Sequence, residues 1–187
     1  MTRRSELILG GQKNGKSRRA ELLARDWLAS APRRRSVLIA TGEPWDDEMR
    51  ARIARHRAER AARVPGLATV EEALDLPGAL LRESRADTLV VVDCLTLWLT
   101  NLAMPAAPRT GGPAPGQAAD ALARAIGRTA GPVVLVSNEI GLGVVPMGRE
   151  VRAFVDGLGR LNQAAAAACD RVVLMAAGLP LVVKDAR

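Results

Sequence analysis

The sequence is poor in aromatic residues, histidine and cysteine. Its 187 residues include no tyrosine, one phenylalanine, three tryptophans, one histidine and two cysteines. Proteins that bind single-stranded nucleic acid commonly stack bases on aromatic side chains, so this scarcity argues against that class. Two cysteines cannot form a disulfide framework, and the positions of Cys94 and Cys169 match no metal-binding motif. We expect both to be reduced thiols of a cytoplasmic protein.

Long hydrophobic runs are also missing. No stretch approaches the roughly 20 apolar residues that a transmembrane helix requires, and the N-terminus lacks the pattern of a secretory signal. We therefore expect a cytoplasmic location and no membrane insertion. Hydrophobic residues make up 48% of the chain and charged residues 25%, which is the balance of an ordinary globular protein. The length fits a single domain over residues 1–187.

Acidic residues are fewer than basic ones, 20 against 27, for a formal net charge of +7. Arginines gather at 33–35 and again within 50–60. A basic surface of this kind suits either nucleic acid or a pocket for polyphosphate substrates. Because no recognisable nucleic-acid-binding module accompanies the charge, we favour the polyphosphate pocket and predict no nucleic-acid partner.

Short apolar runs alternate with helical patterns along the whole chain. The runs are nearly continuous in Val, Leu and Ile, which is typical of strands buried on both faces of a parallel sheet. They occupy 6–9, 36–40, 88–93, 132–137 and 171–176, with a further extended piece at 179–184. The helical patterns occupy 16–29, 45–60, 71–84, 95–103, 117–129 and 149–168. This alternation predicts a three-layer α/β fold with a mostly parallel sheet flanked by helices. Residues 104–116, with four prolines and three glycines, predict a long loop.

The most informative motif follows the first apolar run. It matches G-x-x-x-x-G-K-[ST] and consists of Gly10, Gly11, Gln12, Lys13, Asn14, Gly15, Lys16 and Ser17. In such a loop the backbone N–H groups hold phosphate oxygens, the lysine reaches the β- and γ-phosphates and the serine binds Mg²⁺. A glycine-rich turn without a ligand is the alternative, which the strand before the loop and the helix after it disfavour. The sequence therefore predicts a P-loop NTPase-like (RecA-like) nucleotide-binding domain.

Two further residues are candidates for the same site. Asp93 ends the predicted strand 88–93, where a Walker B carboxylate binds Mg²⁺, although an aspartate there can instead cap the next helix. His56 is the only histidine and lies in the arginine-rich helical segment. Its imidazole is a nitrogen nucleophile, but a lone histidine on a charged helix is more often a surface residue. The residues alone leave both interpretations of His56 open.

The chain resembles the bifunctional adenosylcobinamide kinase/adenosylcobinamide-phosphate guanylyltransferase family of cobalamin biosynthesis. The resemblance extends over nearly the whole chain. It rests on residues 8–18, 39–41, 47–49, 52–53, 56–57, 93–102, 137–146 and 159–163. Two departures are visible: Gln12-Lys13-Asn14 stands where many members have Ala-Arg-Ser, and residues 61–67 lack the family's Pro-x-x-Trp.

The resemblance implies two reactions. In the first, ATP or GTP phosphorylates the hydroxyl of the aminopropanol arm of adenosylcobinamide. In the second, His56 attacks the α-phosphate of GTP, releases pyrophosphate and forms a guanylyl-histidine. Adenosylcobinamide phosphate then takes up GMP to give adenosylcobinamide-GDP. The resemblance thus implies that His56 and Lys16 are catalytic.

The resemblance also implies the surroundings of these two residues. Nucleotide-binding residues outside the loop are Thr41, Gly42, Glu43, Arg57, Ala58, Glu59, Arg60, Glu71 and Asp93. Mg²⁺ is the implied cofactor, held by Ser17 and Asp93. Members are expected to form homotrimers with sites between subunits.

Two other functions stay open at this point. One is a P-loop kinase of another small metabolite, without guanylyltransferase activity and with a merely structural His56. The other is a non-catalytic nucleotide- or nucleic-acid-binding module that uses the basic surface.

Overall fold

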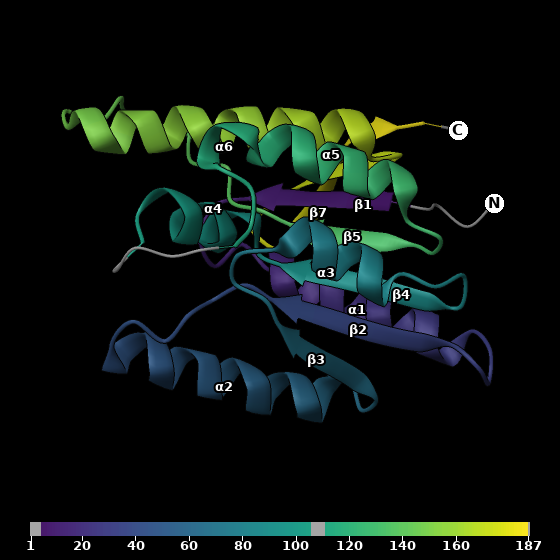
Figure 1. Ribbon diagram of the computed structural model, residues 1–187. Helices are drawn as coiled ribbons and strands as arrows, with labels where there is room; N and C mark the ends of the chain where they lie inside the picture. Colours follow the sequence, from purple (N-terminus) through teal and green to yellow (C-terminus); the bar gives the residue numbers. More distant parts are fainter. Residues whose placement is uncertain (1–4, 106–110, 187) are drawn as a thin grey trace.

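A seven-stranded, mostly parallel sheet forms the centre of the molecule (Figure 1). The computed structural model describes residues 5–105 and 111–186. The strands are β1 (Ser5–Gly10), β2 (Arg35–Ala40), β3 (Leu67–Glu71), β4 (Thr88–Asp93), β5 (Val133–Val136), β6 (Arg171–Ala176) and β7 (Leu179–Asp185). Their order is β3-β2-β4-β5-β1-β6-β7, and all neighbours pair in parallel except β6 and β7.

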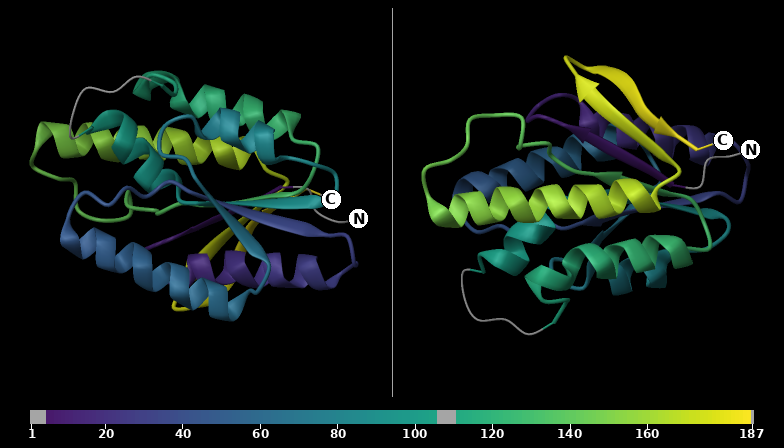
Figure 2. Two further views of the ribbon diagram at one scale, coloured as in Figure 1. Left: turned by 60° about the horizontal axis from the view of Figure 1, so that its bottom comes forward. Right: turned by 90° about the horizontal axis from the view of Figure 1, so that it is seen from above.

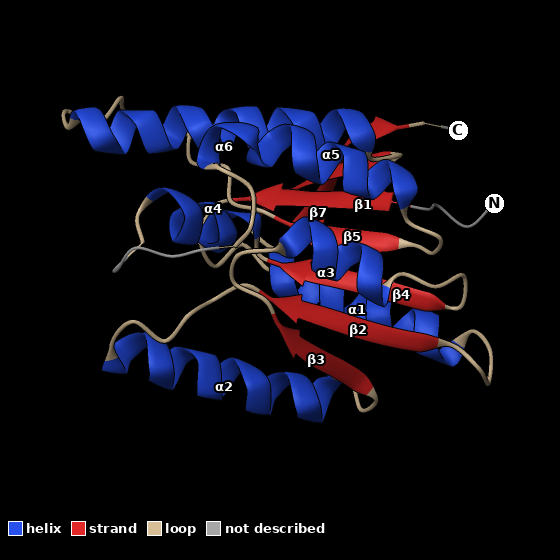
Figure 3. Cartoon of the chain, in the orientation of Figure 1, coloured by secondary structure: helices blue, strands red, loops and turns tan. Residues whose placement is uncertain are grey.

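Helices cover both faces of the sheet, as Figures 2 and 3 show. They are α1 (Lys16–Ala29), α2 (Asp47–Arg63), α3 (Leu76–Glu83), α4 (Leu95–Ala103), α5 (Ala118–Arg128) and α6 (Arg149–Ala168), with a short 3₁₀ turn at Pro115–Gln117. α1 and α2 lie on one face, and α3 to α6 lie on the other. None of the helices in the described part of the chain is long and apolar enough to cross a membrane.

The two faces bury two separate apolar cores, because successive strand residues point to opposite sides. Under α3 to α6, strand residues such as Leu7 and Val90 pack with Leu80 and Trp98. Under α1, the neighbouring strand residues pack with the small side chains of that helix. This division explains why the central strands read as continuous apolar runs. The predicted α/β fold is confirmed.

One strand was not predicted, and one helix was predicted to begin too early. Residues 71–84 were expected to be helical, but Glu71 ends the edge strand β3 and α3 begins only at Leu76. The Asp75 side chain accepts the Gly78 N–H at 3.1 Å and caps α3 at its N-terminus. β3 is the edge strand of the sheet and contains two half-buried and three exposed residues but no fully buried one. It therefore lacks the continuous apolar run by which the other strands were found.

The predicted loop 104–116 is only partly described, since residues 106–110 lie outside the described part of the chain. The rest of the segment is irregular up to the turn at Pro115–Gln117. That 1–187 is a single catalytic domain stays a prediction.

Candidate active site

The loop between β1 and α1 has the backbone that a phosphate-binding loop needs. Gly10 and Gly15 adopt φ values of 150° and 86°, and Lys13 is left-handed at 59°. A Cβ on Gly10 would lie 2.7 Å from the Met175 carbonyl oxygen, so that position accepts only glycine without a shift of β6. The loop leads directly into the N-terminus of α1, whose free N–H groups favour anions.

Lys16 is held inside the site. Its Nζ donates to the Gly11 carbonyl at 2.6 Å, and only 7% of the residue is exposed. Burial lowers the pKa of the Lys16 amine, while the nearby Cys94 and Asp93 raise it. A phosphate beside this amine would favour its charged form.

Asp93 lies at the carboxyl end of β4, next to the end of β2. The segment that follows it is fixed by Thr41, which is fully buried. The Thr41 hydroxyl donates to the Cys94 carbonyl at 2.7 Å and accepts the Cys94 N–H at 2.9 Å. Asn101 in turn donates to the Thr41 carbonyl at 2.7 Å. Thr41 therefore positions the chain at Asp93, a role that the sequence did not reveal.

A cleft of about 740 Å³ lies above the loop, and we call it the P-loop cleft. Its lining includes the loop from Gln12 to Ser17, His56 and Glu59 from α2, and Asp93. A smaller cleft of about 110 Å³, the α2–β3 cleft, is lined by Gly42, Arg57, Arg60 and Glu71. His56, Ser17 and Asp93 border both clefts. The structure thus brings together the candidate nucleophile, the candidate metal ligands and the loop.

Other expected site residues lie outside the lining of these two clefts: Gly10, Gly11, Thr41, Glu43 and Ala58. Gly11 contributes its carbonyl to Lys16. The Glu43 carboxylate accepts the Trp45 indole N–H at 3.3 Å. Ala58 is exposed. Their nucleotide contacts stay predictions.

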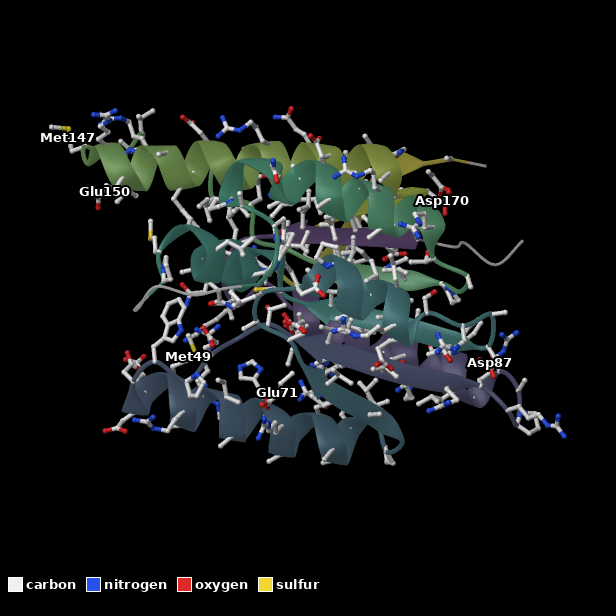
Figure 4. All side chains as sticks on the ribbon, viewed as in Figure 1. Met49, Glu71, Asp87, Met147, Glu150 and Asp170 are labelled. Atoms are coloured by element: carbon white, nitrogen blue, oxygen red, sulfur yellow. The ribbon has the colours of Figure 1, made fainter. Side chains whose placement is uncertain are left out.

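Charged contacts hold α2 over the sheet. Asp46 caps the helix by accepting the Met49 N–H at 2.7 Å, and among the described side chains of α2 only Arg60 is buried. Arg63 pairs with Glu21 of α1, and Arg57 pairs with Glu71 at the end of β3. Figure 4 shows Glu71 between β3 and α2, while Asp87 and Asp170 lie at the opposite end of the sheet. α2, which carries His56, is thus linked to α1 and to β3 by ion pairs.

Sequence reasoning missed one group of residues in the P-loop cleft. Glu48, Arg52 and Arg63 of α2 line it together with His56 and Glu59. These five follow one another at helical spacings of four, four, three and four residues, so they share one face. This spacing is visible in the sequence and could have predicted that these charged residues share a helix face with His56. Asn138 also lines the cleft, and its N–H donates to the Thr96 hydroxyl at 2.9 Å.

The described residues contain no cluster of three or more His, Cys, Asp or Glu side chains arranged to hold a metal. One hydroxyl and one carboxylate, Ser17 and Asp93, border the same clefts. Mg²⁺ at a nucleotide site usually takes one or two protein ligands and completes its shell with phosphates and water. The residues present fit that kind of site.

Comparisons with known proteins identify the family. A family described as cobinamide kinase / cobinamide phosphate guanyltransferase matches residues 6–183. The bifunctional adenosylcobalamin biosynthesis protein CobP of Pseudomonas aeruginosa is 45% identical over 179 residues, which is 96% of each chain. The proteins named CobU of Salmonella typhimurium and Escherichia coli are each 36% identical over 191 residues, covering 95% of this chain and 98% of theirs.

A solved structure supports the fold alone. The flagellar accessory protein FlaH of Methanocaldococcus jannaschii aligns with 97% of this chain and 78% of its own, at a TM-score of 0.51 and 12% identity. The sequence comparisons go further, because the family match and the relatives each span nearly the whole chain. The chain belongs to the cobinamide kinase / cobinamide phosphate guanyltransferase family.

Proposed function

We propose that this protein phosphorylates adenosylcobinamide with ATP or GTP and then transfers GMP from GTP to adenosylcobinamide phosphate. The intermediate is a guanylyl group on His56. One observation carries the proposal: a single cleft is lined by the P-loop, by Asp93 and by the only histidine of the chain. The names of the relatives, which describe bifunctional adenosylcobalamin biosynthesis proteins, support it.

The kinase step uses the loop. Backbone N–H groups of the loop and the Lys16 ammonium bind the phosphates of the donor, and orient the γ-phosphate toward the cleft. Ser17 and Asp93 would hold Mg²⁺, which would offset the negative charge of the donor phosphates. The substrate hydroxyl attacks the γ-phosphorus and loses its proton to solvent, while the bond from that phosphorus to the bridging oxygen breaks and the nucleoside diphosphate leaves.

The transferase step uses α2. A nitrogen of neutral His56 attacks the α-phosphorus of GTP, and the bond to the β-phosphate breaks, so that pyrophosphate leaves from the loop. Arg52 and Arg55, which line the cleft beside His56, offset the negative charge of the phosphates. An oxygen of adenosylcobinamide phosphate then attacks the same phosphorus and displaces His56.

The α2–β3 cleft is proposed to hold the guanine. The Glu71 carboxylate at its edge can accept the N1–H and amino hydrogens of guanine, which adenine does not present in that pattern. Arg57, now paired with Glu71, and Arg60 line the same cleft. The remaining expected contacts, Thr41, Gly42, Glu43, Ala58 and Glu59, belong to this part of the proposal.

A homotrimer with sites between subunits and a cytoplasmic location are also part of the proposal. Exposed apolar side chains in one loop favour an interface between copies of the chain. Leu142, Val144, Val145 and Met147 are 73–96% exposed in the segment before α6, and Figure 4 shows Met147 at one end of the molecule. Light scattering after gel filtration tests the trimer.

Turnover of the two substrates tests the proposed function. Purified protein with adenosylcobinamide, ATP and GTP should produce adenosylcobinamide-GDP. His56→Ala should stop at adenosylcobinamide phosphate, while Lys16→Ala should leave adenosylcobinamide unchanged. A chain that phosphorylates another small metabolite but not adenosylcobinamide would favour the simple kinase. Salt-sensitive DNA binding without turnover would favour the nucleic-acid-binding module.

A further inference from the structure

The P-loop opens on two sides. On one side lies the P-loop cleft, which extends to His56 and Asp93. On the other side lies a second cleft of about 720 Å³ between α1 and the turn that joins β6 to β7. We call it the hairpin cleft. The two clefts share Lys13, Asn14, Gly15 and Arg18, so they meet over the first turn of α1.

The hairpin cleft is built against the loop by specific contacts. The Asn14 side-chain amide donates to the Met175 carbonyl at the end of β6, at 3.2 Å. A Cβ added to Gly15 would lie 3.7 Å from the Cα of Gly178, so the β6–β7 turn passes close to the loop. Ala177 and Gly178 are both left-handed, with φ of 50° and 80°, and form the tight turn that brings β7 back.

The lining of the hairpin cleft combines apolar surface with cations. Leu22, Leu23 and Pro180 contribute apolar surface, and Arg18 and Lys13 lie at the end next to the loop. Arg19 and Arg25, which also line the cleft, are already paired with Glu6 and Asp26. Among the described residues, Lys13 and Arg18 form no ion pair. Apolar walls with cations at one end suit a nucleoside whose phosphates enter the loop.

The two reactions of the proposed function require opposite directions of the triphosphate. The kinase step needs the γ-phosphate exposed to the acceptor in the P-loop cleft, near Lys16 and Asp93. The α-phosphate then lies over the loop backbone near Arg18, and the nucleoside continues into the hairpin cleft. The transferase step instead needs the α-phosphate at His56, with the pyrophosphate group in the loop. Its nucleoside must therefore lie on the α2 side.

We propose that the hairpin cleft is the binding subsite for the nucleoside of the purine nucleoside triphosphate that donates the γ-phosphate. The guanosine of the guanylylation step occupies the α2–β3 cleft, on the other side of the loop. The acceptor stays in the P-loop cleft for both steps, and only the nucleotide changes direction. This inference rests on the proposed function.

A tryptophan in the hairpin cleft tests the subsite. Leu22→Trp fills the cleft, and Ala29→Trp is the matched control, because residue 29 is exposed, lies seven residues along the same helix face and lines none of the three clefts. Leu22→Trp should raise the KM for ATP in the kinase reaction by about tenfold or more. It should change the rate of labelling by [α-³²P]GTP by less than about twofold, and Ala29→Trp should change neither. Equal effects of Leu22→Trp on both activities, or an unchanged KM for ATP, would overturn the inference.

Photocrosslinking provides a second measurement on the unmodified chain. With [γ-³²P]8-azido-ATP, crosslinked peptides should come from residues 19–26 or 175–180. Crosslinks confined to α2 or β3 would overturn the inference. A chain that fails to phosphorylate adenosylcobinamide would overturn the proposed function instead, so the two failures are distinguishable.

Discussion

Thr41 directly follows β2, and its hydroxyl forms hydrogen bonds with Cys94, the residue after β4 and after the candidate metal ligand Asp93. Thr41→Val removes this hydroxyl and keeps the shape of the side chain. The hydroxyl accepts the Cys94 N–H and donates to the Cys94 carbonyl. The Cys94 carbonyl also accepts the backbone N–H of Trp98 at 3.2 Å, so this carbonyl keeps a hydrogen-bond partner in the variant. The Cys94 N–H would be left without its only hydrogen-bond acceptor in the described part of the chain.

The cost follows from these two bonds. An unpaired buried N–H costs about 1–3 kcal/mol, and the loss of the other hydrogen bond about 0.5–1.5 kcal/mol. We therefore expect Thr41→Val to lower the free energy of unfolding by about 2–4 kcal/mol. With an m-value of about 2 kcal/mol/M, the urea midpoint should fall by about 1–2 M. Kinase activity should fall too, because the segment that carries Asp93 loses its anchor.

Thr41→Ser is the control, since it keeps the hydroxyl and removes one methyl group. Thr41→Ser should lower the free energy of unfolding by about 1 kcal/mol. Urea unfolding followed by circular dichroism measures both variants. If Thr41→Val were as stable as Thr41→Ser, within about 0.5 kcal/mol, the hydroxyl would not fix this segment and the reasoning would be refuted.

Three other predictions concern the loop and the thiols. Without nucleotide at pH 7, Lys16→Met should be more stable to urea than the wild type, because burial lowers the pKa of the Lys16 amine and so disfavours its charged form. The amine titrates near 10.5 in the unfolded chain and below that in the folded protein. The stability difference between Lys16→Met and the wild type should therefore narrow as pH rises toward 10.5, and a stability difference that widened would contradict this prediction. Burial raises the pKa of Cys94 to about 11 and that of Cys169 to about 12, so both thiols should react with Ellman's reagent at pH 8 only after unfolding, and fast labelling of the folded protein would count against their burial. Gly10→Ala should lower the melting temperature by several degrees and abolish kinase activity, because its Cβ would meet the Met175 carbonyl; a wild-type melting curve would show that β6 can shift.

The sequence predicted the parts of the site that local pattern determines. The loop from Gly10 to Ser17 carries its own motif, and Asp93 ends a continuous apolar run, so both could be placed without knowledge of the rest of the fold. The structure places Asp93 and the loop residues from Gln12 to Ser17 at one cleft. His56 could be recognised as a candidate, but only the resemblance to a family favoured the nucleophile over a surface residue.

Other parts depend on contacts between residues far apart in the sequence. β3 is an edge strand without an apolar run, so it was not predicted, and Glu71 was wrongly placed in a helix over 71–84. The ion pair of Arg63 with Glu21 joins residues 42 positions apart, and no spacing rule predicts it. The hairpin cleft likewise depends on the left-handed turn at Ala177 and Gly178 meeting a loop near the other end of the chain.

The central claim is that one cleft carries both phosphorus chemistries, with His56 as covalent acceptor of GMP. Incubation with [α-³²P]GTP and Mg²⁺, followed by denaturing electrophoresis, tests it most directly. The wild type should retain label that is lost in acid and stable in alkali, as expected for a phosphoramidate. His56→Ala should retain none while still phosphorylating adenosylcobinamide with ATP. Label of equal intensity on His56→Ala, or no label on a wild-type preparation with kinase activity, would contradict the account.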